Sequence, residues 1–176
     1  MYTGTIYIYG KSGRAVQISS SNEVVLSADG RGAAAFEVVA CLASASVPAD
    51  LRPACISLMD ASRPRWYIRH RAGFLHVDPT SSPINPSLFN SDSSFIVHPN
   101  MSDPGSFVLE SVNYRLHYIT AQADGRLKIV ARENITDPKD ARFRVSGSTT
   151  LSSYCQTFDR RLTISSLCAC AVQNSP

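Results

Sequence analysis

The sequence predicts an all-β fold built from many short strands. Apolar and polar residues alternate over short runs, and β-branched and aromatic residues fill those runs. Turn residues such as Asp29-Gly30 and Asp124-Gly125 separate them. No segment keeps a capped 3.6-residue apolar period, apart from a short turn at Pro48–Leu51. Short strands without helices are typical of a barrel or a sandwich.

The strands that we expect follow one another along most of the chain. They cover residues 5–9, 23–26, 35–39, 66–70, 94–97, 107–111, 127–130 and 142–145.

Parts of this pattern recur three times. Three similar sequence segments, at 33–38, 92–97 and 140–145, have Phe36, Phe95 and Phe143 at the same position. Further segments recur in two clear copies, namely 55–58 with 107–110, 66–69 with 117–120, and 74–77 with 126–129. A weaker first copy runs through residues 6–9, 13–18 and 24–26.

Three copies of a four-strand unit, each about 45 residues without insertions, indicate a repeat architecture. One copy cannot bury its own apolar face, whereas three copies around a pseudo-threefold axis close a barrel without open edges. We therefore predict a β-trefoil with three four-strand repeats over residues 1–146, with the three Phe residues in its core. The alternative is a β-sandwich with chance similarity. Residues 147–176 match no repeat, and we interpret them as a poorly ordered tail or an extra C-terminal module.

Charge and hydropathy argue against nucleic acid and membrane as partners. The formal net charge is +3, and the Arg residues are spread along the chain instead of forming a basic stripe. The densest run, residues 63–71, suits a solvated hairpin edge better than an RNA-binding surface. No apolar stretch approaches the ~20 residues of a membrane span.

The five cysteines match no zinc signature, so we expect no metal and no cofactor. Cys41 and Cys55 could close their loop as a disulfide, worth about 3 kcal/mol. The sequons at 100–102 and 134–136 favour an extracellular or secreted protein. The N-terminus alternates like a strand and does not resemble a signal peptide, so the chain is either cytosolic or a fragment of a secreted protein.

Motifs of common enzymes are missing from the sequence. It has no Gly-rich phosphate loop, His-Glu-x-x-His or nucleophile elbow, which disfavours a hydrolase. We expect His98 in a surface loop, and His76 could face either side of its strand.

Two residues look placed for sugar binding. His70 ends the second strand of repeat two beside Trp66 and Tyr67, and Asp92 lies in the turn three residues before Phe95. A sugar site needs such a mixture of carboxylate, ring nitrogen and aromatic face. If the imidazole accepts from a hydroxyl, its protonation below about pH 6.5 should weaken binding. The alternative role for Asp92 is an Asx turn.

Several of these segments resemble the arabinose-binding (AbfB-type) β-trefoil domain of fungal α-L-arabinofuranosidase B, classed as carbohydrate-binding module family 42. The resemblance is clearest at residues 65–70, 74–77 and 89–95, continues at 107–112 and 140–143, and spans about residues 5–145. It implies binding of arabinofuranose side chains of plant polysaccharides, one pocket per lobe, with catalysis in a separate domain.

The resemblance also assigns residues to each lobe. In repeat two it implies that His70 and Asp92 contact the sugar, with Tyr67 and Trp66 alongside. In repeat three Asp140 and Tyr118 match, but Ala121 occupies the His position. In repeat one Ala33 occupies the Asp position. We therefore expect a lectin-like, non-catalytic module with one main pocket and a carbohydrate ligand; it could be joined to other domains of a larger protein. The alternative is a degenerate trefoil serving as an extracellular protein-interaction or structural domain.

Overall fold

The structure is a computed structural model that describes residues 5–29, 31–81, 85–100 and 102–147. The tail predicted at 147–176 lies, beyond Gly147, outside the described residues. So do Cys155, Cys168 and Cys170. The division of the chain at residue 146 stays a prediction.

Within the described residues the chain forms twelve strands, one short α-helix and five 3-10 turns, which confirms the all-β class. The helix α1 spans Pro86–Asp92. The strands are β1 (Thr5–Tyr9), β2 (Val16–Ile18), β3 (Val24–Leu26), β4 (Ala35–Ala40), β5 (Cys55–Asp60), β6 (Trp66–Arg71), β7 (Phe74–Pro79), β8 (Phe95–Pro99), β9 (Phe107–Ser111), β10 (His117–Ala121), β11 (Leu127–Ala131) and β12 (Arg144–Gly147).

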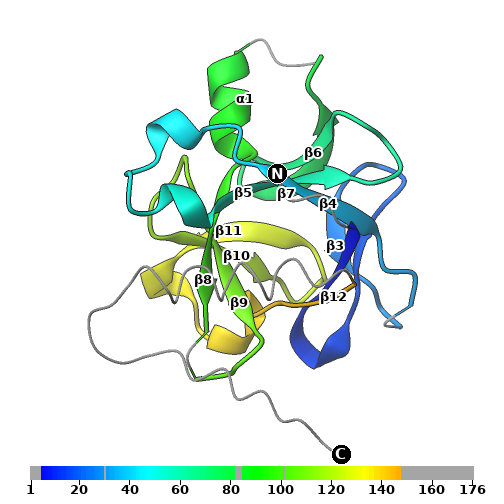
Figure 1. Ribbon diagram of the computed structural model, residues 1–176. Helices are drawn as coiled ribbons and strands as arrows, with labels where there is room; N and C mark the ends of the chain where they lie inside the picture. Colours follow the sequence, from blue (N-terminus) through cyan, green and yellow to red (C-terminus); the bar gives the residue numbers. More distant parts are fainter. Residues whose placement is uncertain (1–4, 30, 82–84, 101, 148–176) are drawn as a thin grey trace, which may run out of the picture.

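The strands pair into a sheet that closes on itself. Ten of them form one sheet in the order β12-β1-β4-β5-β6-β7-β11-β10-β9-β8, and β5 also pairs with β8. That second pairing closes a ring of seven strands (Figure 1). Strands β2 and β3 form a separate hairpin that touches β7 and β11 through isolated bridges.

The register around the three repeated Phe residues follows one pattern. Phe36 lies opposite Asp60, and Phe95 lies opposite Ser111. Arg144 lies opposite Tyr9, which places Phe143 level with the residue after β1. All three Phe side chains are buried, as the sequence predicts. Their grouping into a trefoil of three four-strand repeats stays a prediction at this point.

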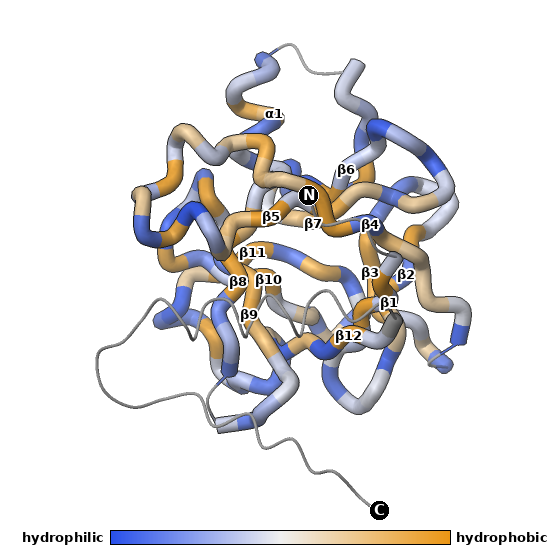
Figure 2. Tube along the Cα trace, viewed as in Figure 1, coloured by the Kyte–Doolittle hydropathy of each residue, from blue (hydrophilic) through white to orange (hydrophobic). Residues whose placement is uncertain are grey.

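The core consists of a main cluster and a satellite. The main cluster collects the inward residues of all twelve strands except β12 and includes the three repeated Phe residues. Figure 2 shows these apolar stretches along the strands, with hydrophilic residues in the outer loops. The satellite lies under the loop between β4 and β5, where Val47 and Ala54 pack against Ile96. The predicted Cys41–Cys55 disulfide closes this loop and is confirmed.

Three expectations differ from the structure. Asp92 is the last residue of α1 and not part of a turn. His98 lies on β8, not in a loop. The last strand begins at Arg144 and not at Arg142, and Phe143 makes an isolated bridge with Phe107. The positions of His98 and Phe143 depend on pairing with β9 and Phe107, which local patterns do not show, whereas Asp92 ends a short helix.

Candidate functional site

His70 and Asp92 lie side by side. His70 sits near the end of β6 and Asp92 ends α1, and their Nε2 and Oδ1 atoms are 3.3 Å apart. Both residues are buried, with 3 % and 7 % of their surface exposed. The helix starts where the Asn85 side chain accepts a hydrogen bond from the Leu88 amide and Pro86 follows. This short helix therefore carries Asp92 to the end of β6.

The end of β9 and the segment after it complete the group. The Ser111 hydroxyl lies 3.1 Å from Nε2 of His70, and the Asn113 amide donates to Oδ1 of Asp92 at 2.7 Å. The Tyr114 ring packs edge-on 5.3 Å from the His70 ring and is 49 % exposed. We call these five residues, His70, Asp92, Ser111, Asn113 and Tyr114, the His70 cluster.

Burial sets the protonation of the His70 cluster. It lowers the pKa of His70 to about 4, and the positive charges of Arg69 and His117 act in the same direction. Burial also raises the pKa of Asp92, against the Asn113 hydrogen bond and the Arg69 charge, which lower it. The imidazole is therefore neutral in the pH range where the sequence analysis expected it to gain a proton.

The two predicted aromatic residues lie apart from this cluster. Tyr67 points to the other side of β6 and packs edge-on against Phe89 of α1, with ring centres 6.4 Å apart. Trp66 packs against the main core, and the Arg63 guanidinium lies 4.5 Å from its ring. The exposed aromatic ring beside His70 is thus Tyr114, which the sequence analysis did not single out.

A buried carboxylate holds the segment that carries Tyr114. Glu110 is 1 % exposed and accepts hydrogen bonds from the Leu116 amide at 2.9 Å and the Arg115 guanidinium at 2.7 Å. Nε2 of His98 lies 2.6 Å from its other oxygen. Although burial would raise the pKa of Glu110, these hydrogen bonds and the charge of Arg115 outweigh it and lower the pKa. Glu110 therefore stays charged and anchors residues 115–116.

The predicted third-repeat residues lie in two places. Asp140 and Ala121 share a pocket of about 540 Å³ that also includes Thr120. Asp140 is already paired there with Lys11, at 3.0 Å. Tyr118 is not among the residues that line this pocket, and its ring lies 6.1 Å from that of His98. The structure therefore brings together only part of this predicted site.

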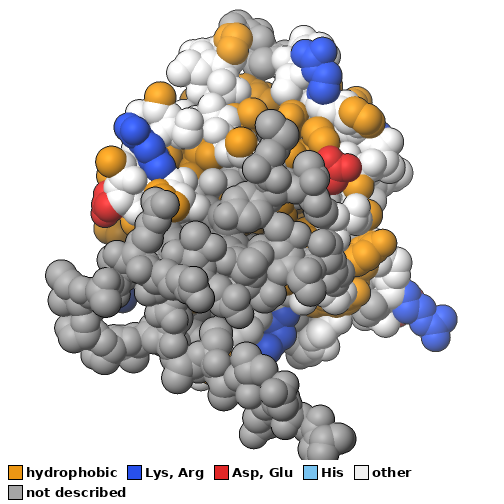
Figure 3. Space-filling model, in the orientation of Figure 1, with side chains coloured by type: hydrophobic (Ala, Val, Ile, Leu, Met, Phe, Trp, Pro, Cys, Tyr) orange, Lys and Arg blue, Asp and Glu red, His pale blue; other side chains and the backbone are white. Residues whose placement is uncertain are grey.

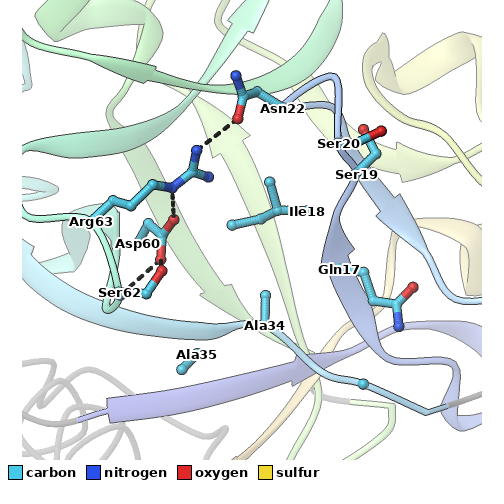
Figure 4. A pocket seen from close by; sticks show the side chains of 11 residues that line it. Gln17, Ile18, Ser19, Ser20, Asn22, Ala34, Ala35, Asp60, Ser62 and Arg63 are labelled. Carbon is cyan, nitrogen blue, oxygen red and sulfur yellow. Dashed lines mark hydrogen bonds and ion pairs between the residues drawn. The ribbon is translucent and has the colours of Figure 1, made fainter.

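A second pocket, of about 570 Å³, lies between the β2–β3 hairpin and the loop after β5 (Figure 4). Ile18 and Ala34 form apolar parts of its wall, and Asp60 and Arg63 form a polar part. The sequence analysis predicted none of these as site residues. Asp60 lies opposite Phe36 as Ser111 lies opposite Phe95, a correspondence that only the strand register reveals.

Three further observations concern other kinds of site. Within the described ranges, no three His, Cys, Asp or Glu side chains gather as metal ligands would. The only α-helix described, α1, is seven residues long, and no described helix is long and apolar enough to cross a membrane. On the face drawn in Figure 3, the Lys and Arg side chains lie apart from one another.

Comparison with known proteins places the chain in a family. Residues 3–148 match the family described as alpha-L-arabinofuranosidase B (ABFB) domain, so the chain belongs to the AbfB domain family. This domain is the carbohydrate-binding module, family 42, of arabinofuranosidases, in which it is an accessory, non-catalytic domain. The resemblance inferred from the sequence is confirmed. No curated protein matches the chain.

Solved structures share the fold. An arabinofuranosidase complexed with arabinofuranosyl-α-1,2-xylobiose is similar with a TM-score of 0.63 and 17 % identity, over 83 % of this chain and 31 % of that one. A chicken interleukin-1 beta mutant has a TM-score of 0.62 and 12 % identity, over 84 % and 97 % of the two chains. A protein described as BEL beta-trefoil has a TM-score of 0.59 and 9 % identity, over 84 % and 95 %. The chain thus spans about a third of the arabinofuranosidase's length.

Proposed function

We propose that the chain is a non-catalytic carbohydrate-binding module that recognises arabinofuranose or a similar sugar side chain through the His70 cluster. We also propose that its strands form a β-trefoil of three four-strand repeats. The pairing of His70 with Asp92 carries the functional proposal, because these residues come from separate elements and meet beside an exposed aromatic ring. Membership of the AbfB family and the arabinofuranosyl ligand of the similar arabinofuranosidase support it.

The His70 cluster offers groups of the kinds that a sugar ring requires. Among the described residues, the nearest charged partner of Asp92 Oδ2 is Arg69 at 3.9 Å, so this oxygen can accept hydrogen bonds from sugar hydroxyls. The Asn113 amide and the neutral His70 imidazole hold that carboxylate in place from one side. The partly exposed Tyr114 ring provides an apolar face for the C–H side of a sugar. Asp92 would thus act as the acceptor and Tyr114 as the platform.

The other predicted repeats lack this arrangement, which favours one main pocket. In the pocket of Asp140, Lys11 already pairs with the carboxylate, and Ala121 provides no ring nitrogen. In the first repeat Ala33 stands where Asp92 stands in the second. The module would work outside the cell beside a catalytic domain, and the Cys41–Cys55 disulfide is typical of such oxidising surroundings.

A glycan array with the full chain tests this function. Arabinan and arabinoxylan oligosaccharides should bind with a Kd in roughly the millimolar to micromolar range. Asp92→Ala should weaken binding at least about tenfold, because it removes a charged acceptor that is hard to replace. Asp124→Ala is the matched control, since Asp124 is exposed and, among the residues that the structure describes, pairs only with nearby Arg126.

Folding must be followed in the same samples. If Asp92→Ala stays folded and loses the glycan, the His70 cluster is the binding site. If the folded wild-type chain binds no glycan, the alternative of a degenerate trefoil for protein interaction becomes the better explanation. Turnover of an aryl arabinofuranoside by the chain would contradict the non-catalytic role.

A further inference from the structure

The pocket between the β2–β3 hairpin and the loop after β5 differs in chemistry from the His70 cluster. Ile18, Ala34 and Ala35 provide its apolar wall, and Ser19, Ser20 and Arg63 stand among its polar groups. It contains no imidazole, and its carboxylate, Asp60, is buried. A ligand of this pocket would therefore meet other groups than a ligand of His70 and Asp92.

Arg63 is held rigidly at the edge of the pocket. Its Nε donates to Oδ2 of Asp60 at 2.5 Å, and its Nη1 donates to the Asn22 side chain at 2.7 Å. Its Cζ atom lies over the Trp66 ring, 4.5 Å from the ring centre. Asn22 reaches this position with a φ of 62°, a conformation that Asn adopts more readily than most residues. Contacts on three sides thus preorganise the guanidinium.

The guanidinium keeps donors for a ligand. An Arg side chain has five N–H groups. Only Nε and one N–H of Nη1 have a hydrogen-bond partner among the described residues. Figure 4 shows the remaining edge turned toward the Ile18 side of the pocket. The Arg63 side chain is 32 % exposed and that of Asp60 only 4 %, so a ligand in the pocket would reach the cation first.

Asp60 supports this cation and does not compete with a ligand anion for space. Both its oxygens are engaged, since the amide and hydroxyl of Ser62 donate to Oδ1 at 2.9 and 2.7 Å. Burial would raise the pKa of Asp60, but the hydrogen bonds from Ser62 and Arg63 outweigh burial and lower it. Because Asp60 offsets part of the positive charge, binding of an anion here should be weak and should depend on salt.

We propose that this pocket binds the carboxylate of an acidic sugar, such as a uronic acid residue, through the free N–H groups of Arg63. Paired N–H donors match the two oxygens of a carboxylate, and an Arg already fixed in place loses little freedom on binding. The apolar wall at Ile18 and Ala34 would take the C–H face of the ring. This proposal does not depend on arabinofuranose binding at the His70 cluster.

An NMR titration of the full chain tests the proposal, with D-glucuronate as probe and with D-glucose and acetate as matched controls. Glucuronate should shift the amide signals of Ser20, Ala34 and Ser62, and 150 mM NaCl should weaken the effect. Glucose lacks the charge and acetate lacks the ring, so each should produce at most about a third of the shift. Equal shifts with glucose would show that the carboxylate is not recognised, which would overturn the proposal of an acidic ligand. Equal shifts with acetate would show that the ring is not recognised, which would overturn the proposal of a sugar ligand. No shift in these residues would overturn the pocket itself.

A pair of variants avoids the risk of unfolding. Ser20 is exposed at the pocket, so Ser20→Asp adds a negative charge without changing the core. It should raise the Kd for glucuronate at least threefold, whereas the neutral, equally sized Ser20→Asn should leave it within twofold. Equal effects of both variants would contradict a charge-based site. Asp92→Ala should leave glucuronate binding unchanged, which separates this test from that of the His70 cluster.

Discussion

At the scale of single residues, the burial of His70 determines how the site responds to pH. The ring is 3 % exposed and Nε2 contacts both Ser111 and Asp92. Because Asp92 accepts hydrogen bonds when ionised, the neutral imidazole that donates from Nε2 fits this contact. The folded protein therefore favours the neutral form well below the usual histidine pKa.

We predict that acid destabilises the fold through His70 between about pH 6.5 and pH 4. The pKa of His70 falls from 6.5 to about 4 on folding, so the unfolded chain takes up the proton first as the pH drops. The contribution of His70 to the free energy of unfolding is fully present above pH 6.5. It should be lost across this window, by on the order of 3 kcal/mol. Sugar binding should persist to about pH 5 in a folded sample, not weaken near pH 6.5.

Urea unfolding at several pH values, together with an NMR titration of the ring protons of His70, measures this. Asp92, whose pKa is raised, contributes with the opposite sign, so the wild type must be compared with His70→Gln. The variant should lose most of the slope between pH 6.5 and 4. A titration midpoint of His70 near 6.5 would contradict the prediction.

The sequence reveals some residues of this site and not others. His70 and Asp92 could be found because they stand at fixed distances from repeated core residues, Ile68 and Phe95. Asn113 and Tyr114 could not, because they join the site through the pairing of β8 with β9. Tyr67 was assigned to the site because it lies close to His70 in the sequence, but side chains an odd number of residues apart in a strand point to opposite sides.

At the scale of elements, the segment between β9 and β10 depends on one buried carboxylate. Glu110 binds the amide of Leu116, whose φ of 61° is unusual for a branched side chain. It also binds the Arg115 side chain. Tyr114 thus lies in a segment that Glu110 of β9 holds in place through Arg115 and Leu116.

We predict that Glu110→Ala both destabilises the protein and weakens sugar binding. The change removes the acceptor for the Leu116 amide and Arg115 and leaves a buried cavity, so we expect a loss of about 2–4 kcal/mol in the free energy of unfolding. Urea unfolding without glycan measures the loss of stability, and the glycan titration measures the loss of affinity. The matched control is Asp124→Ala, which breaks an exposed pair and should cost under about 1 kcal/mol. Unchanged glycan affinity in folded Glu110→Ala would show that Tyr114 does not need this anchor.

The helix α1 shows what a local pattern can hide. Its seven residues are too few for an apolar period of 3.6 to be recognised. The signal that could have revealed it is Asn85-Pro86, an N-cap residue followed by Pro in the first turn. The strands were easier to predict: β9, Phe107–Ser111, has the predicted bounds, because alternation and turn residues mark both ends.

At the scale of the whole molecule, strands far apart in sequence close the structure. β1 pairs with β12 across the whole length of the chain described, and Phe107 bridges to Phe143. The all-β class was predictable because short alternating runs lie between turn residues. The repeated Phe36, Phe95 and Phe143 are buried alike, but the trefoil that they indicate stays a prediction. The pocket beside Arg63 was not predictable, because it needs the contact of Arg63 with Asn22, 41 residues earlier in the chain.

Because its first and last described strands pair, the domain should fold only when the chain reaches the end of β12. We predict that a fragment ending at residue 147 folds cooperatively, while one ending at residue 141 does not. The shorter fragment lacks β12, the partner of β1, and Phe143, which packs in the core against Phe107. Amide dispersion in NMR spectra and thermal unfolding measure both fragments.

A point variant separates the loss of Phe143 from the loss of β12. Phe143→Ala in the longer fragment should lower the free energy of unfolding by about 3–5 kcal/mol, since it empties a buried aromatic position while β12 remains. If this variant is still folded and the fragment ending at residue 141 is not, the pairing of β12 with β1 contributes beyond the packing of Phe143. If instead the fragment ending at residue 147 fails to fold, residues 148–176 belong to the domain, and their interpretation as a tail or separate module is wrong.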